Sequence, residues 1–237
     1  MPRIPDAKLL EDQEMRPPPE ADPEAPAPEM DISMEDLPPM PEPDSELQSS
    51  QSIGGVTFVF VAIAAAVGVT HGVGLSLHSL PDTWWWFCLI FIYTQAAAAL
   101  CCLAILLFGD PGRILRSPET CFPVPPEVAE RLKSGESLDG LENVRDGNRS
   151  YCVRCCVWRT HPMVSPSLLC CFDCERHPHH CRVCGRCVDG FDHHCGVFGR
   201  CIANKNMPFF ATLVGLGYAG FISTVVITIV SISLSYE

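Results

Sequence analysis

Three long apolar runs constrain this chain more than any other feature. Residues 53–77, 84–108 and 207–234 contain no Asp, Glu, Lys or Arg. Each run exceeds the roughly twenty residues that a helix needs to cross a bilayer, and such lengths argue against buried helices of a soluble core. The short link between the first two runs predicts a helical hairpin, and Trp84, Trp85 and Trp86 suit a membrane–water boundary. We predict an α-helical integral membrane protein with three spans.

The formal charge of −12 belongs almost entirely to the amino-terminal tail. Residues 1–50 hold fourteen acidic and three basic side chains, together with twelve of the twenty-two prolines. Such a segment buries too little apolar surface to offset the entropy of ordering it, so residues 1–52 are predicted to be a disordered acidic tail. The tail lacks the basic start and apolar core of a signal peptide, and its charge gives no indication of nucleic-acid binding.

The basic residues predict the topology. Thirteen of the sixteen Lys and Arg lie between residues 113 and 205, in the loop between the second and third runs. Arg113 and Arg116 follow one run closely, while Arg200 and Lys205 precede the other. Because cytosolic loops are enriched in such residues near the membrane, we expect this loop and the tail to lie in the cytosol.

Residues 151–206 form a cysteine- and histidine-rich segment. Eleven of the fifteen cysteines fall between Cys152 and Cys201, in Cys-x2-Cys pairs and beside histidines. A disulfide framework would not need the histidines, and reducing conditions in the cytosol oppose it. Thiolate and imidazole at these spacings are typical of tetrahedral zinc, which we therefore predict to stabilise this segment.

Asp192, His193, His194 and Cys195 are consecutive within that segment. A cysteine attacks as the thiolate, a neighbouring histidine can remove its proton, and a carboxylate can hold the imidazole in the useful tautomer. The quartet is thus the composition of an activated nucleophile. We predict Cys195 as nucleophile, His193 as base and Asp192 as the residue that orients the base.

Together these motifs resemble the DHHC protein S-acyltransferases, which attach palmitate to cysteine. The resemblance runs from His180 to Phe210, through the Cys-x2-Cys-x2-Cys spacing, the quartet, Cys201-Ile202 and Asn206. A second mark of that family is an Asp-Pro-Gly motif after a span, which here is Asp110-Pro111-Gly112 at the start of the linker 109–150.

The resemblance implies two structural zinc ions. One set of ligands would be Cys181, Cys184, His194 and Cys201. The other would be His180, Cys187 and an upstream Cys-x2-Cys pair, for which neither candidate has the family's gap of about nine residues. Cys171/Cys174 leave five residues before His180 and Cys152/Cys155 leave twenty-four. We favour Cys171 and Cys174, because a shorter loop costs less closure entropy, and Cys152 and Cys155 stay open as the alternative.

The implied activity is transfer of a long-chain acyl group from palmitoyl-CoA to cysteines of client proteins through an acyl-enzyme on Cys195. The implied partners are acyl-CoA, client proteins with accessible cysteines, and membrane lipids. The implied location is the Golgi or the endoplasmic reticulum, with the zinc domain facing the cytosol.

The sequence departs from the family pattern after the quartet. Gly196-Val197-Phe198 stands where the family usually has Pro-Trp, and Arg200 replaces an asparagine. The family also has a fourth span and a Thr-Thr-x-Glu motif after the third, so we expect either a chain truncated after its third span or a cavity closed by another chain. The alternative functions are an inactive membrane-tethered zinc module that acts as a binding platform, and a RING-type ubiquitin ligase, which would not need the quartet.

Overall fold

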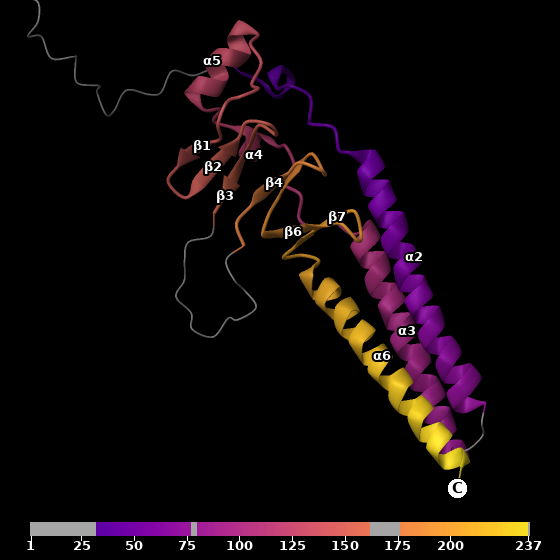
Figure 1. The fold of residues 1–237 in the computed structure, drawn as a ribbon. Coiled ribbons are helices and arrows are strands. Elements are labelled where there is room, and N and C mark those ends of the chain that lie inside the picture. The colour runs from indigo at the N-terminus through magenta and orange to yellow at the C-terminus, as the bar shows by residue number, and fades with distance from the viewer. Residues whose placement is uncertain (1–31, 77–79, 162–175, 237) are drawn as a thin grey trace, which may run out of the picture. The chain divides into compact units, whose positions relative to one another are not determined.

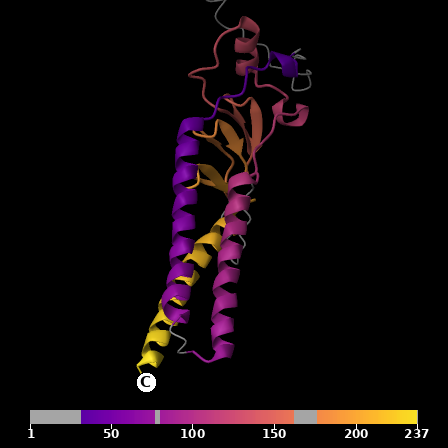
Figure 2. The ribbon, with the colours of Figure 1, turned by 90° about the vertical axis from the view of Figure 1, so that its right-hand side faces the viewer.

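Three long helices dominate the part of the chain that the structure, a computed structural model, describes: residues 32–76, 80–161 and 176–236. They are α2 (Ser45–Val69), which continues into a π-helical turn at Thr70–Leu75, α3 (Asp82–Phe108) and α6 (Met207–Ser235). All three are long and apolar enough to cross a membrane, as the sequence predicts. Figures 1 and 2 show them side by side, with the strands gathered at one end.

Helix α2 begins before the predicted span. Its first residue is Ser45 and not Ile53, because the side chain of Asp44 caps it by accepting a hydrogen bond from the backbone N–H of Leu47 at 2.9 Å. The predicted disordered tail, residues 1–52, therefore extends too far along the chain. Residues 32–52 include a short 3₁₀ turn at Met34–Asp36 and the first turns of α2. Residues 1–31 lie outside the described part of the chain.

The cysteine-rich segment folds into short antiparallel pairs. Strands β1 (Val144–Asp146), β2 (Arg149–Cys152) and β3 (Val157–Thr160) form one sheet, and β4 (His179–Cys181) pairs with β5 (Arg186–Val188). Strand β6 (Phe191–Cys195) pairs with β7 (Arg200–Ala203), which leads into α6. These strands are too short to be stable alone, so they need support from outside each pair.

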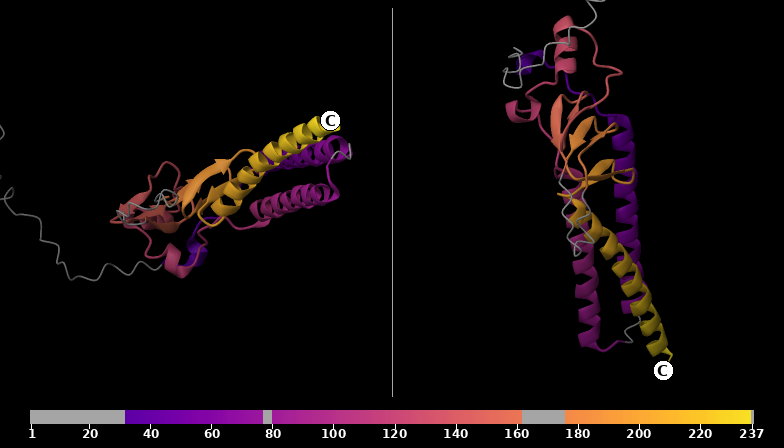
Figure 3. Two further views of the ribbon diagram at one scale, coloured as in Figure 1. Left: turned by 90° about the horizontal axis from the view of Figure 1, so that it is seen from below. Right: turned by 90° about the vertical axis from the view of Figure 1, so that its left-hand side faces the viewer.

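Two short helices lie in the chain between α3 and the three-stranded sheet. They are α4 (Pro118–Cys121) and α5 (Pro126–Ser134), and Figure 3 shows α5 at the end away from the long helices. Helix α5 begins at Pro126, with Glu127 in its first turn and Arg131 and Lys133 in its last turn. Trp158 of β3 donates from its indole to the carbonyl of Pro123 at 2.7 Å, which ties the sheet to this segment.

The strands meet the long helices through an apolar cluster. Cys195, Phe198 and Ile202 from the β6–β7 hairpin are buried against side chains of all three helices: Val59, Ala99, Cys102, Leu103, Leu106 and Leu213. Most other apolar side chains of the helices are exposed, as expected for surfaces that face lipid. The hairpin that carries the quartet therefore lies at one end of the helix bundle.

Candidate metal centres and nucleophile

Two groups of four ligand side chains lie in the hairpins. The first contains Cys152, Cys155, His180 and Cys187, all buried, and the second contains Cys181, Cys184, His194 and Cys201. Within each group all four ligand atoms lie within 4.8 Å of one another. Each strand of the β4–β5 hairpin contributes to the first group, and the ends of β4, β6 and β7 contribute to the second.

The interatomic distances fit tetrahedral zinc. Zinc with Zn–N of about 2.0 Å and Zn–S of about 2.3 Å separates a nitrogen and a sulfur ligand by about 3.5 Å. In the second cluster Nδ1 of His194 lies 3.5 Å from Cys181 Sγ, 3.4 Å from Cys184 Sγ and 4.0 Å from Cys201 Sγ. In the first, Nδ1 of His180 lies 3.2 Å from Cys155 Sγ and 3.8 Å from Cys187 Sγ. Both clusters can hold a zinc ion.

A disulfide does not fit these distances. Cys184 and Cys201 have sulfurs 3.4 Å apart, whereas a disulfide requires about 2.05 Å. All the cysteines of both clusters are free. Hydrogen bonds from neighbouring thiols hold the pKa of Cys181 and of Cys152 far below the ordinary thiol value. The thiolate is the form of cysteine that binds metal.

The pair that completes the first cluster is Cys152/Cys155, the alternative that loop closure disfavoured. The favoured pair, Cys171 and Cys174, lies outside the described residues. Cys152 ends β2, and the turn that follows brings Cys155 beside it. The residues that follow the pairs Cys152/Cys155 and Cys181/Cys184 both have a left-handed backbone, with φ of 52° at Cys156 and 62° at Gly185. The two pairs thus form the same kind of metal-binding turn.

Strand β6 separates the two histidines of the quartet. Because successive side chains of a strand point to opposite faces, His193 and Cys195 share one face and His194 points to the other. His194 accordingly lies with the second metal cluster. His193 and Cys195 pair with Ile202 and Arg200 of β7. The predicted base and nucleophile are two residues apart on the same side of β6.

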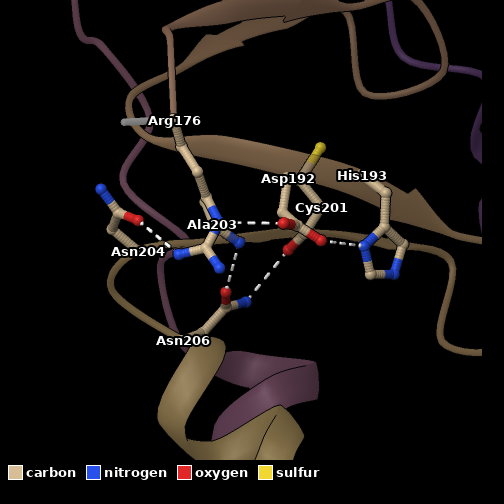
Figure 4. A network of polar contacts seen from close by, with 7 residues as sticks. All are labelled: Arg176, Asp192, His193, Cys201, Ala203, Asn204 and Asn206. Carbon is tan, nitrogen blue, oxygen red and sulfur yellow. Dashed lines mark hydrogen bonds and ion pairs between the residues drawn. The ribbon is translucent and has the colours of Figure 1, made fainter. Parts of the chain in front are cut away.

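Asp192 orients His193. Its Oδ2 lies 2.7 Å from Nδ1 of His193, and its Oδ1 accepts a hydrogen bond from Nε of Arg176 at 2.8 Å (Figure 4). The hydrogen bond with His193, followed by that from Arg176, lowers the pKa of Asp192, so the carboxylate is ionised at neutral pH. With Nδ1 bound to the carboxylate, Nε2 is the nitrogen of His193 left to exchange a proton.

Two asparagines complete the polar network of Figure 4. Asn204 accepts from Arg176 Nη1 at 3.0 Å, which fixes the second edge of that guanidinium. Asn206, which is buried, accepts from the backbone N–H of Ala203 at 2.8 Å and donates to the carbonyl of Cys201 at 3.0 Å. Asn206 therefore joins the start of α6 to the strand that carries a metal ligand.

This geometry agrees with a comparison against protein families. Residues 167–237 match the family model described as DHHC palmitoyltransferase. The chain carries a DHHC domain. The family prediction is confirmed, and the matched region includes β4 to β7, the quartet and α6. No curated protein matches the chain.

The Asp-Pro-Gly motif joins α3 to the DHHC domain. The backbone N–H of Asp189 donates to the carbonyl of Gly112 at 2.9 Å, and that of Ile114 donates to the carbonyl of Cys187 at 2.9 Å. Asp110 accepts from the backbone and side chain of Arg113. The segment that follows α3 thus lies along β5, beside a ligand of the first cluster.

A basic pocket of about 570 Å³ lies beside the first cluster of the DHHC domain, and Cys152 and His180 form part of its wall. Its cationic and histidine lining comprises Arg145, Arg154, Arg159, Arg182, His161 and His179. Glu142 is the one acidic residue among the described residues that line it. Arg159 is only 7% exposed, and its Nε has no hydrogen-bond partner among the described residues. The pocket suits a polyanion.

Sequence reasoning did not find Arg176, Asn204 or the basic pocket. No motif distinguishes Arg176 from the other arginines of the loop, and its partner Asp192 is sixteen residues away in the chain. The pocket gathers arginines from strands and turns that only the metal-binding hairpins bring together. The sequence alone does, however, assign His193 and His194 to opposite faces, because successive side chains of a strand point to opposite sides.

Proposed function

We propose that this protein is a protein-cysteine S-palmitoyltransferase that acts through an acyl-enzyme on Cys195. The observation that carries the proposal is the placement of His193, held by Asp192 at 2.7 Å, on the same face of β6 as Cys195. Cys195 is at the same time buried in the apolar cluster at the end of the three helices. Base, nucleophile and apolar surroundings thus meet at one hairpin.

In the first half-reaction Nε2 of His193 takes the proton of the Cys195 thiol. The thiolate attacks the carbonyl carbon of the acyl-CoA thioester, the bond between that carbon and the CoA sulfur breaks, and CoA leaves with the proton from His193. In the second half-reaction His193 takes the proton of a client cysteine, whose sulfur attacks the acyl carbon; the bond from that carbon to Cys195 breaks, and the sulfur of Cys195 takes the proton back from His193. Asp192 stabilises the imidazolium that forms in each half.

The zinc ions are proposed to be structural. The ligand sets are Cys152, Cys155, His180 and Cys187 for one ion and Cys181, Cys184, His194 and Cys201 for the other. Zinc supplies the cross-links that hold the short hairpins in place. Cys152 and Cys155 replace Cys171 and Cys174 in this proposal, because they complete a tetrahedral set with His180 and Cys187 among the described residues.

The two ends of acyl-CoA find matching surroundings. Its long acyl chain suits the apolar side chains around Cys195, since each buried methylene contributes about 0.8 kcal/mol. Its phosphates suit the basic pocket, where Arg159 offers a buried guanidinium nitrogen without a partner among the described residues. Acyl-CoA is therefore the proposed donor, and client proteins with accessible cysteines are the acceptors.

The proposed orientation places the hairpins in the cytosol. Arg113 and Arg116 follow α3 and Lys205 precedes α6, so basic residues flank the same ends of two candidate membrane helices. Reducing conditions there preserve the free thiols of both clusters. The Golgi or the endoplasmic reticulum is the proposed membrane, where lipids surround the exposed apolar faces of the helices.

The test is acylation of the purified full chain in detergent. A clickable palmitoyl-CoA analogue should give a hydroxylamine-sensitive label that Cys195→Ser abolishes and His193→Ala reduces about 100-fold or more. Absence of label on a folded, zinc-loaded wild type would refute the proposal and favour the inactive, membrane-tethered zinc module that acts as a binding platform.

A further inference from the structure

The first turns of α2 touch the second metal cluster. Oε1 of Gln51 lies 3.1 Å from Nε2 of His194. The other ring nitrogen, Nδ1, faces the sulfurs of Cys181, Cys184 and Cys201. Gln51 and His194 are 143 residues apart in sequence, so only the fold brings them together.

The chemistry of His194 decides the direction of this contact. A histidine binds zinc through a nitrogen that carries no proton, so Nδ1 must be unprotonated and Nε2 must carry the hydrogen. Nε2 is then a donor, and Oε1 of Gln51 is the acceptor in reach. A protein acceptor on the second nitrogen of a zinc-binding histidine fixes its tautomer and ring orientation.

Gln51 is itself held in place. One turn before it, the side chain of Gln48 donates to the carbonyl of Val183 at 2.9 Å, in the turn between Cys181 and Cys184. The next residue, Ser52, donates to the carbonyl of Phe198 at 2.7 Å, in the turn after Cys195. Helix α2 therefore contacts the β4–β5 and β6–β7 hairpins on both sides of Gln51, and this restricts where its amide can point.

We propose that Gln51 is a positioning residue for the second zinc centre, fixing the tautomer of His194 from the first candidate membrane helix. Through His194 it also fixes the strand that presents the adjacent Cys195. This inference rests on the proposed zinc ligand set, and it adds a residue outside the DHHC domain to the machinery of that domain.

The experiment measures zinc release from the purified full chain in detergent. A chromogenic chelator follows the rate and the number of equivalents, and alkylation followed by mass spectrometry identifies which cysteines become reactive. Gln51→Met keeps the size of the side chain and removes the acceptor. We expect release from the cluster of Cys181, Cys184 and Cys201 to become about 10- to 100-fold faster, with the other cluster unchanged.

Two variants separate positioning from a general packing defect. Gln51→Glu keeps an acceptor and should restore slow release. Gln48→Met removes a hydrogen bond between α2 and the same metal-binding turn without touching a ligand nitrogen, so release should stay close to the wild-type rate. Equal acceleration at both clusters, or equal effects of Gln48→Met and Gln51→Met, would mean that Gln51 only supports packing and would overturn the inference.

The same measurement tests the proposed zinc ligand sets and the role of Gln51 separately. A wild type that binds two zinc ions, combined with a Gln51→Met variant that releases both at wild-type rates, overturns the role of Gln51 and leaves the ligand sets intact. A wild type without zinc at Cys181, Cys184 and Cys201 overturns the ligand set and the inference together.

Discussion

Helix α2 packs tightly at Gly55 against the turn that follows the proposed nucleophile. A Cβ added at Gly55 would lie 2.7 Å from the carbonyl carbon of Val197 and 2.9 Å from its Cγ1, and closer still to its carbonyl oxygen. Real Cβ atoms essentially never come within 3.0 Å of such neighbours. The Gly55→Ala variant must therefore separate the helix from the turn that holds Val197.

The size of the effect follows from that clash. Relieving contact with a backbone oxygen requires a shift on the order of 1 Å, since no flexible side-chain end can move away instead. Overpacking of this kind costs roughly 1–3 kcal/mol. A misplacement of about 1 Å at a reacting group can lower a rate about 100-fold. Because Val197 is two residues from Cys195, we expect Gly55→Ala to lower the rate of acyl-enzyme formation about 100-fold.

Gly54 supplies the matched control. A Cβ at Gly54 meets nothing within 4 Å, although it is the neighbouring residue of the same helix. Gly54→Ala should therefore acylate at the wild-type rate, and it should be at least as stable, because alanine favours the helix. Both variants are compared by single-turnover labelling with the clickable palmitoyl-CoA analogue and by thermal unfolding. Wild-type labelling of a folded Gly55→Ala protein would refute the proposed control of Cys195 by α2.

Three further predictions concern the polar residues of the site and the basic pocket. Asp192→Asn should lower the acyl-enzyme rate at least about 100-fold without zinc loss, because His193 loses its carboxylate; an unchanged rate in the labelling assay would contradict that role. Arg159→Gln should raise the acyl-CoA concentration needed for half-maximal labelling about tenfold or more and leave the maximal labelling rate unchanged. The control Arg131→Gln, on α5, should change neither that concentration nor the maximal rate. Burial, followed by the charges of His177 and Arg159, lowers the pKa of His161 in the folded chain below its ordinary value of about 6.5. The unfolded chain therefore binds a proton at His161 more readily than the folded chain does, and the folded state becomes less stable as the pH falls through this range. Thermal stability should fall as the pH drops from 7 toward 5.5, and it should fall less in His161→Gln.

The sequence predicts the helices well, because hydropathy alone determines where a chain can cross a bilayer. The candidate spans Asp82–Phe108 and Met207–Ser235 contain the predicted runs 84–108 and 207–234, while Ser45–Val73 overlaps the predicted run 53–77 only in part. The first span begins earlier than predicted because a cap, and not hydropathy, sets its boundary at Ser45. That difference matters for function, because the extra turns of α2 carry Gln51 and Ser52 to the hairpins. A span prediction that stops at the apolar edge omits them.

Loop length gives only a weak basis for choosing between the upstream cysteine pairs. Loop closure favours Cys171/Cys174, but closure entropy grows only logarithmically, so twenty-four residues instead of five cost just about 1.4 kcal/mol more. Pairing of β2 with β3, which places Cys152 and Cys155 at one end of a sheet, outweighs so small a difference. The left-handed turn that Cys152/Cys155 share with Cys181/Cys184, with positive φ at Cys156 and Gly185, is visible only in the structure, because the residue type of Cys156 does not predict it.

The contacts around Cys195 argue that the helices and the hairpins work as one unit. Helix α2 reaches the hairpins through Ser52, the end of α3 continues along β5 through Gly112, and α6 begins at Asn206, which holds β7. The hairpins bury Tyr151, Val157, Val188 and Ile202, and the proposed metal cross-links would add to these contacts, while the helix ends set the placement of the hairpins. A change at any of these three junctions should therefore alter acylation at Cys195 even where both zinc ions are retained. Zinc content and acylation rate are for this reason separate measurements of the site.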